Sequence, residues 1–333
     1  MLWFAARQTG TVIGRDRGPM HNSATTRKLT ALLIVLALAA LIAGCGKSAP
    51  AGSFASTGAS HGGFDVVAGE NFWGSIAAQL AGEKATVQSI IVNPGTDPHS
   101  YEPTAQDART LASSKMAIVN GIGYDKWMSQ DLAASASSGR VVLTVGDLLG
   151  LKEGDNPHQW YSPSSVFKVI DGIVAAYDRL DPSDSAYFAH RKQAFETYGL
   201  ARYDQLRQEI RSRYKGVAIG YSESIFQPLG EDLGLRLLTP YSFTKAIAEG
   251  TDVSAQDRQT VDRQALRREI EVWVYNSQNV TPDVQRATTI AEARQIPIAT
   301  VTETLSPASD DFQQWQVAEL EGLAAALHRA TGR

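Results

Sequence analysis

Short apolar runs alternate with amphipathic stretches from Phe64 onward, and this alternation predicts the fold. Apolar runs typical of buried strands occupy residues 64–68, 86–92, 115–120 and 140–145. Between them, apolar residues recur at helical spacing over 71–82 and 103–114. Strands that alternate with helices form parallel βαβ units. Residues 64–182 are therefore predicted to form an N-terminal α/β lobe.

The same alternation returns after Gly216. The predicted strands cover 217–222, 236–240, 271–276 and 297–302, and the predicted helices cover 255–269, 282–294 and about 310–329. Residues 216–333 should therefore form a C-terminal lobe of the same class. The predicted fold is α/β, with two Rossmann-like lobes, each a mostly parallel sheet flanked by helices.

Helical spacing also fills the segment between the two lobes, at 163–180 and 184–214. The second stretch is about 30 residues long, which corresponds to roughly 45 Å at 1.5 Å per residue. We predict that residues 183–215 form one long helix that joins the lobes, although Gly199 near its middle weakens the pattern. A single helical bridge would restrict hinge bending compared with several flexible connections.

The N-terminus carries the pattern of an export signal. A basic pair precedes an apolar run of about 15 residues, and small residues follow immediately before Cys45. This order is typical of a secretory signal, and the run is short for a membrane-spanning helix, which needs about 20 apolar residues. Residues 1–44 are predicted to be a signal peptide that starts at Met1 or Met20. A plain transmembrane anchor is the alternative.

The small residues before Cys45 resemble the lipobox of bacterial lipoproteins, which implies cleavage before Cys45 and a lipid on its sulfur and amino group. Cys45 is also the only cysteine, and lipidation explains a single thiol in an exported chain. Residues 45–63 are rich in glycine, serine and alanine, as flexible tethers are. The mature protein is thus predicted to be anchored by lipid to the outer face of the cell membrane.

The charge balance argues against nucleic acid as a partner. The whole chain has a formal net charge of −4. Residues 1–44 hold five basic and one acidic side chain, so 26 basic and 34 acidic groups remain after cleavage, a formal charge of −8. Nucleic-acid-binding proteins show a basic footprint instead. With one cysteine the chain forms no internal disulfide, so its stability must come from burial.

Four residues with ligand chemistry lie where predicted strands give way to loops. His99 lies among turn-forming residues in "NPGTDPHSYEPTAQD", and His158 lies in the similar "NPHQWYSP". Glu223 and Glu303 each end an apolar strand of the C-terminal lobe. Ligands of open parallel sheets bind at the carboxyl ends of the strands. The residues alone leave two alternatives open: hydrogen-bonded surface histidines, and carboxylates that are solvated at loop tips.

Three motifs together, "NPGTDPHSYEPTAQD", "AIVNGIGYDKWM" and "NPHQWYSP", resemble those of the cluster A-I solute-binding proteins of metal-importing ABC transporters. The resemblance covers nearly all of the chain from about Phe64. It implies one transported divalent ion, manganese or zinc and in some members iron, in the cleft between the lobes. It also implies an ABC permease and its ATPase as partners, a monomer, and no enzymatic activity.

The resemblance further implies four metal ligands. His99 and His158 match the two histidines of the family. Glu223 matches the third ligand, because it ends the first strand of the C-terminal lobe eleven residues before Gly234. The fourth is an acidic residue after the last strand, usually aspartate, and Glu303 is the best match. The sequence also offers three substitutes for it, Asp252, Asp310 and Asp311.

Two imidazoles and two carboxylates leave the choice of metal open. Imidazole suits zinc, iron and nickel, whereas carboxylates suit manganese. The chain lacks a histidine-rich loop and has glutamate at the third position, which favours manganese or iron, although zinc binds such a set more tightly than manganese. The competing interpretations are a metal-dependent hydrolase with a His₂Glu site, which has no His-Glu-x-x-His motif here, and a binding protein for a chelated metal.

Overall fold

The computed structural model describes residues 63–333, except for the side chain of His99. The predicted signal peptide, Cys45 and nearly all of the predicted tether lie outside the described residues, so those predictions stand untested. None of the described helices combines the length and the apolarity that a bilayer crossing needs.

The N-terminal lobe is built on a four-stranded parallel sheet in the order β2-β1-β3-β4. Its strands are β1 (Phe64–Glu70), β2 (Ala85–Ile91), β3 (Met116–Val119) and β4 (Val141–Thr144). Its helices are α2 (Asn71–Ala81), α3 (Ala105–Ser113), α4 (Lys126–Ala134), α5 (Val145–Leu149) and α6 (Pro163–Leu180), with short helices η1 (Pro98–Ser100), η2 (Gln159–Tyr161) and η3 (Pro182–Asp184) in the loops.

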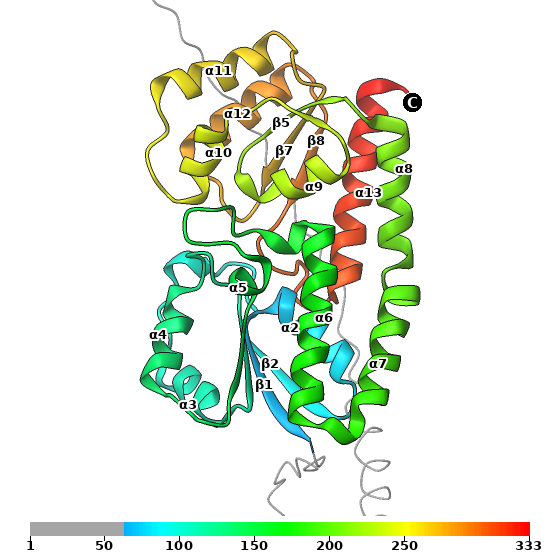
Figure 1. Ribbon diagram of the computed structural model, residues 1–333. Helices are drawn as coiled ribbons and strands as arrows, with labels where there is room; N and C mark the ends of the chain where they lie inside the picture. Colours follow the sequence, from blue (N-terminus) through cyan, green and yellow to red (C-terminus); the bar gives the residue numbers. More distant parts are fainter. Residues whose placement is uncertain (1–62) are drawn as a thin grey trace, which may run out of the picture. The chain divides into compact units, whose positions relative to one another are not determined.

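The C-terminal lobe repeats this arrangement with a parallel sheet in the order β6-β5-β7-β8. Its strands are β5 (Ala218–Tyr221), β6 (Arg236–Leu237), β7 (Val272–Asn276) and β8 (Ile298–Val301). Its helices are α9 (Gln227–Asp232), α10 (Tyr241–Ala248), α11 (Ala255–Leu266), α12 (Pro282–Ala293) and α13 (Phe312–Thr331), with η5 (Ser224–Phe226) after β5. The predicted α/β class with two parallel-sheet lobes is confirmed (Figure 1).

The linking segment is helical except for a bend at Leu200, and it is not one regular α-helix. α7 (Ser185–Ala194) passes into the π-helical turn η4 (Phe195–Gly199), and α8 (Ala201–Tyr214) follows. Gly199 ends the π-turn where a β-carbon would lie 3.0 Å from the Phe195 ring, so the ring occupies the space that a larger residue would need. Such π-turns interrupt the i to i−4 hydrogen-bond ladder locally without ending the helix.

A second helix also ties the lobes together. α13 runs beside α8 in Figure 1 and reaches α2 of the N-terminal lobe. There the Phe312 backbone N–H donates to Ser75 Oγ at 2.9 Å, and the Gln79 and Gln313 side chains exchange hydrogen bonds. The lobes are therefore joined covalently by the α7–α8 segment and by packing through α13, which the sequence pattern did not reveal.

Caps and aromatic packing position the loops at the carboxyl ends of the strands. Ser162 caps α6, with Pro163 in the first turn, so the chain must leave η2 in a fixed direction. Trp160 of η2 is fully buried and stacks on Phe72 of α2, with ring centroids 3.9 Å apart. Tyr124 packs against the same indole at 5.1 Å. This aromatic cluster anchors the loop that carries His158.

Candidate metal centre

Three of the four predicted ligands converge. His158, Glu223 and Glu303 are buried, and one ligand atom from each lies within 4.8 Å of the others. His158 Nε2 lies 3.7 Å from Glu223 Oε1 and 3.6 Å from Glu303 Oε1. One histidine from the N-terminal lobe thus faces two carboxylates of the C-terminal lobe.

Asn156 sets the orientation of the His158 ring. Its Oδ1 accepts from the His158 backbone N–H at 3.1 Å and lies 2.8 Å from ring Nδ1. Its Nδ2 donates to the Ser224 carbonyl at 2.8 Å, which fixes the direction of the amide. Nδ1 is therefore the protonated nitrogen, and Nε2 presents a lone pair to the carboxylates. Asn156 was not predicted from the sequence, although the "NPHQWYSP" motif contains it.

The two carboxylates come from neighbouring strand ends of the C-terminal sheet. Glu223 follows β5 and Glu303 follows β8, and Asn276 ends β7 between them. Asn276 Nδ2 lies 2.9 Å from Glu223 Oε2 and 3.1 Å from Glu303 Oε1, so one amide contacts both carboxylates. Tyr124 of the other lobe donates its hydroxyl to Glu303 Oε2 at 2.8 Å. Neither Asn276 nor Tyr124 was predicted from the sequence.

Burial makes this cluster a poor place for uncompensated charge. Burial, and then the charge of Glu303, raise the pKa of Glu223 to about 8. Burial lowers the pKa of His158 to about 4, against the opposing effect of Glu223. The cluster therefore holds a neutral imidazole beside two carboxyl groups that resist joint ionisation. A divalent cation would stabilise this arrangement, because the cation would compensate both negative charges and accept the lone pair of the ring nitrogen.

A third buried carboxyl group lies near this cluster. Glu70 ends β1, and neither of its oxygens accepts a hydrogen bond from the described residues. Burial, followed by the charges of Asp125 and Glu303, raises the pKa of Glu70. Asp125 accepts from the backbone N–H groups of Asn120 and Gly121, both at 2.7 Å, and burial still raises its pKa to about 6. Glu70 therefore resists ionisation beside the charges of Asp125 and Glu303.

The backbone of His99 lies in η1, and its side chain is outside the described part of the structure. The loop around it lines a cavity of about 380 Å³ that also reaches Glu303. Of the substitutes for the fourth ligand, Asp252 is exposed and Asp311 caps α13, bonded to the Gln314 backbone N–H. Glu303 is the acidic residue that lies with His158 and Glu223.

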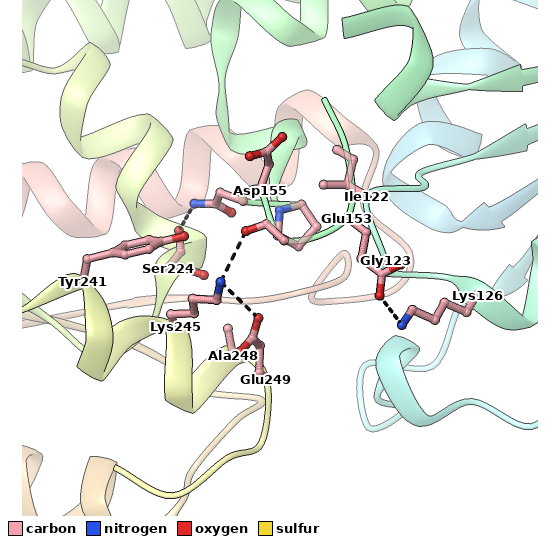
Figure 2. Close-up of a pocket in the computed structure, with 13 residues that line it drawn as sticks. Ile122, Gly123, Lys126, Glu153, Asp155, Ser224, Tyr241, Lys245, Ala248 and Glu249 are labelled. Atoms are coloured by element: carbon pink, nitrogen blue, oxygen red, sulfur yellow. Dashed lines mark hydrogen bonds and ion pairs between the residues drawn. The ribbon is translucent and has the colours of Figure 1, made fainter. Parts of the chain in front are cut away.

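A neighbouring cavity of about 330 Å³ opens between the loop before His158 and α10 (Figure 2). Lys245 of α10 donates to the Gly154 carbonyl at 3.4 Å and lies 3.6 Å from Glu249. On the other wall, Lys126 is paired with Glu153 at 2.6 Å. Both basic groups of this cavity are paired with acidic groups, so it offers no strong field for an anion.

The family comparison agrees with this geometry. The family described as "Zinc-uptake complex component A periplasmic" matches residues 66–326, which is most of the chain. The chain belongs to this family. Members are solute-binding proteins of metal uptake, so the resemblance seen in the three sequence motifs is confirmed.

Relatives of this chain are named for different metals. The manganese-binding lipoprotein MntA of Halalkalibacterium halodurans is 26% identical over 219 residues, covering 62% of this chain and 69% of MntA. The iron-binding protein YfeA of Yersinia pestis is 27% identical over 227 residues, covering 66% of this chain and 71% of YfeA. The Mn-bound periplasmic metal binding protein from Candidatus Liberibacter asiaticus shares the fold, with a TM-score of 0.67 at 20% identity over 79% of this chain and 99% of that one.

Proposed function

We propose that this protein is the extracytoplasmic solute-binding component of an ABC importer, which captures one divalent transition-metal ion and delivers it to a membrane permease. The observation that carries the proposal is the buried convergence of His158 Nε2 with the carboxylates of Glu223 and Glu303. The relatives named for manganese and iron, and the zinc-uptake family itself, support manganese, iron(II) or zinc as the cargo.

The proposed ligand set is His99, His158, Glu223 and Glu303. His99 is included because its motif matches the family, and because the loop that carries it lines a cavity reaching Glu303. An imidazole added to the three converging side chains would give two nitrogen and two carboxylate ligands. Such a set suits a first-row divalent ion and leaves no obvious place for a catalytic water.

The remaining parts of the proposal concern the partners. The lipobox supports a lipid on Cys45 that holds the protein at the outer face of the cell membrane, and MntA is likewise named a lipoprotein. We expect a monomer that meets an ABC permease, with the ATPase on the far side of the membrane. Relatives named as binding proteins support a role without catalysis.

The ion would act as a link between the lobes. His158 belongs to the N-terminal lobe, whereas Glu223 and Glu303 belong to the C-terminal lobe, so one ion bonded to all three favours the closed arrangement. Because the ligands must be deprotonated, binding also releases protons. Uptake and release are thereby coupled to the approach and separation of the two lobes.

Thermal unfolding of the mature chain tests the proposal. The protein is produced from residue 45 with Cys45→Ser, stripped with chelator, and melted with and without manganese, zinc or iron(II). An ion at 100 times its Kd adds about 2.7 kcal/mol to the unfolding free energy, so at least one metal should raise Tm by about 5 °C or more. If none of the three shifts Tm, the proposed function is wrong.

Three variants locate the site in the same assay. His158→Ala and Glu303→Ala should remove most of the metal-dependent shift, because each deletes a direct ligand. His190→Ala is the matched control, since this histidine is exposed on α7 and should leave the shift unchanged. A full shift in Glu303→Ala would move the fourth ligand to another acidic residue.

A further inference from the structure

Hydrogen bonds hold both the side chain and the backbone of Asn276. The side-chain Oδ1 accepts from the Gln278 backbone N–H at 2.9 Å, and the Asn276 backbone N–H donates to Ser222 Oγ at 3.0 Å. Because a backbone N–H can only donate, the oxygen of the amide must point toward Gln278. The Nδ2 group is therefore the end that faces the carboxylates, and the fully buried side chain has no room to turn.

Two amides saturate one oxygen of Glu223. Asn276 Nδ2 donates to Glu223 Oε2 at 2.9 Å, and Asn279 Nδ2 donates to the same oxygen at 3.2 Å. A carboxylate oxygen offers about two lone-pair positions, so Oε2 has none left for a metal ion. Oε1 accepts no hydrogen bond from the described residues and is the oxygen 3.7 Å from His158 Nε2.

From this arrangement we propose that Asn276, assisted by Asn279, is a specificity-determining residue that restricts Glu223 to a single metal-bonding oxygen. The inference rests on the proposed function, because it assigns a role within the same site. With one oxygen from Glu223 and one nitrogen from each histidine, the protein supplies at most five donor atoms, even when Glu303 uses both oxygens. A set of four or five donors fits zinc, which prefers four ligands, better than manganese, which favours six-coordinate oxygen-rich sites.

The same amide also fixes the distance between the two carboxylates. Asn276 Nδ2 bridges Glu223 Oε2 and Glu303 Oε1, so both side chains are held by one group that is itself held by β7. Ligand side chains held in this way cannot move apart to enlarge the site. Supporting hydrogen bonds of this kind typically change metal affinity by about 10- to 100-fold when they are removed.

The test compares zinc and manganese affinities of the wild-type protein, Asn276→Ala and Asn279→Ala by competition with a chromophoric chelator. Removing an amide donor frees Glu223 Oε2 to bond a metal, and this additional oxygen ligand should strengthen manganese binding more than zinc binding. We expect Asn276→Ala to lower the ratio of zinc to manganese affinity by about tenfold. Asn279→Ala, which alters a half-buried loop residue and carries little risk to folding, should shift the ratio in the same direction by a smaller factor.

Cobalt(II) supplies a readout that loss of stability would not imitate. Cobalt in a four-coordinate site gives intense visible bands, which weaken as the coordination number rises. The wild-type protein should show the intense spectrum, and both variants should show weaker bands. Equal ratios and unchanged spectra in both variants would overturn the proposal, as would a wild-type spectrum typical of six ligands.

Asn120→Ala is the matched control. Asn120 is also fully buried and follows β3, which occupies in the first lobe the place that β7 has in the second. Its amide bonds Trp73 Nε1 and the Pro157 carbonyl, not a ligand carboxylate. This variant should leave the ratio of the affinities unchanged. A wild-type protein that binds none of these metals would instead refute the proposed function, so the two failures are distinguishable.

Discussion

The pKa of Glu223 predicts how metal affinity depends on pH. Burial and the charge of Glu303 raise this pKa to about 8, whereas the ion binds the ionised carboxylate. Between pH 7 and 8 the ionised fraction of a group with this pKa rises from about a tenth to about a half. Zinc affinity should therefore increase about fivefold over this interval, with about one proton released per ion at pH 7.

Histidine ligation adds little to the change in this window. Burial lowers the pKa of His158 to about 4, so its ring is neutral throughout. An ordinary histidine, with a pKa of about 6.5, is also mostly neutral above pH 7. The predicted fivefold change is thus specific to the carboxyl group of Glu223.

Calorimetric titration of zinc in two buffers of different ionisation enthalpy measures both the affinity and the proton count. Glu319→Gln is the control, because burial raises the pKa of Glu319 to about 8 as well. Its carboxylate bonds Tyr161, Thr302 and Trp315 and lies outside the ligand cluster, so the variant should keep the wild-type slope. A zinc affinity that stays constant from pH 7 to 8, with no proton release, would refute this electrostatic account.

Two further substitutions test the same cluster. Glu223→Gln should abolish metal binding but raise the Tm of the metal-free protein at pH 8. A carboxyl group whose folded pKa lies above its unfolded value makes the protein less stable as pH rises from about 4.5 to 8, and the substitution removes this loss. At pH 5 the gain in Tm should nearly vanish, and an equal gain at both pH values would contradict this explanation. Tyr124→Phe deletes the 2.8 Å hydrogen bond to Glu303. Since a hydrogen bond to a charged group contributes about 1.5–3 kcal/mol, zinc binding should weaken about tenfold or more. An unchanged Kd in chelator competition would show that this bond does not orient the Glu303 carboxylate.

Hydrophobic periodicity was sufficient to predict the fold class, because the central strands β3, β5 and β7 are buried and read as short apolar runs. It was weaker for short elements. α4 and α10 were not predicted, and neither begins with a side-chain cap that a sequence would show. β6 was predicted over 236–240 but pairs only at Arg236–Leu237, because the chain then turns toward Pro240 and α10.

The sequence predicted the three side chains that converge, His158, Glu223 and Glu303, but not the contacts that support them. Glu223 and Glu303 follow β5 and β8, and His158 lies in the Pro-His motif before η2, so each carries a local signal. Their partners come from remote segments: Tyr124 is 179 residues before Glu303, and Asn276 reaches two carboxylates on different strands. Such pairings depend on how the two lobes pack, which no spacing within the sequence encodes.

These supporting contacts bear on how an ion would enter and leave. The lobes share hydrogen bonds that do not involve the ligand atoms, including Asn156 Nδ2 to the Ser224 carbonyl at 2.8 Å and Tyr161 Oη to the Thr302 carbonyl at 2.9 Å. α13 adds packing against α2 beside the covalent α7–α8 link. Because several contacts hold the lobes together, a bound ion would strengthen an existing interface and would not be its only bond. Any separation of the lobes that releases an ion would therefore also have to break these polar contacts.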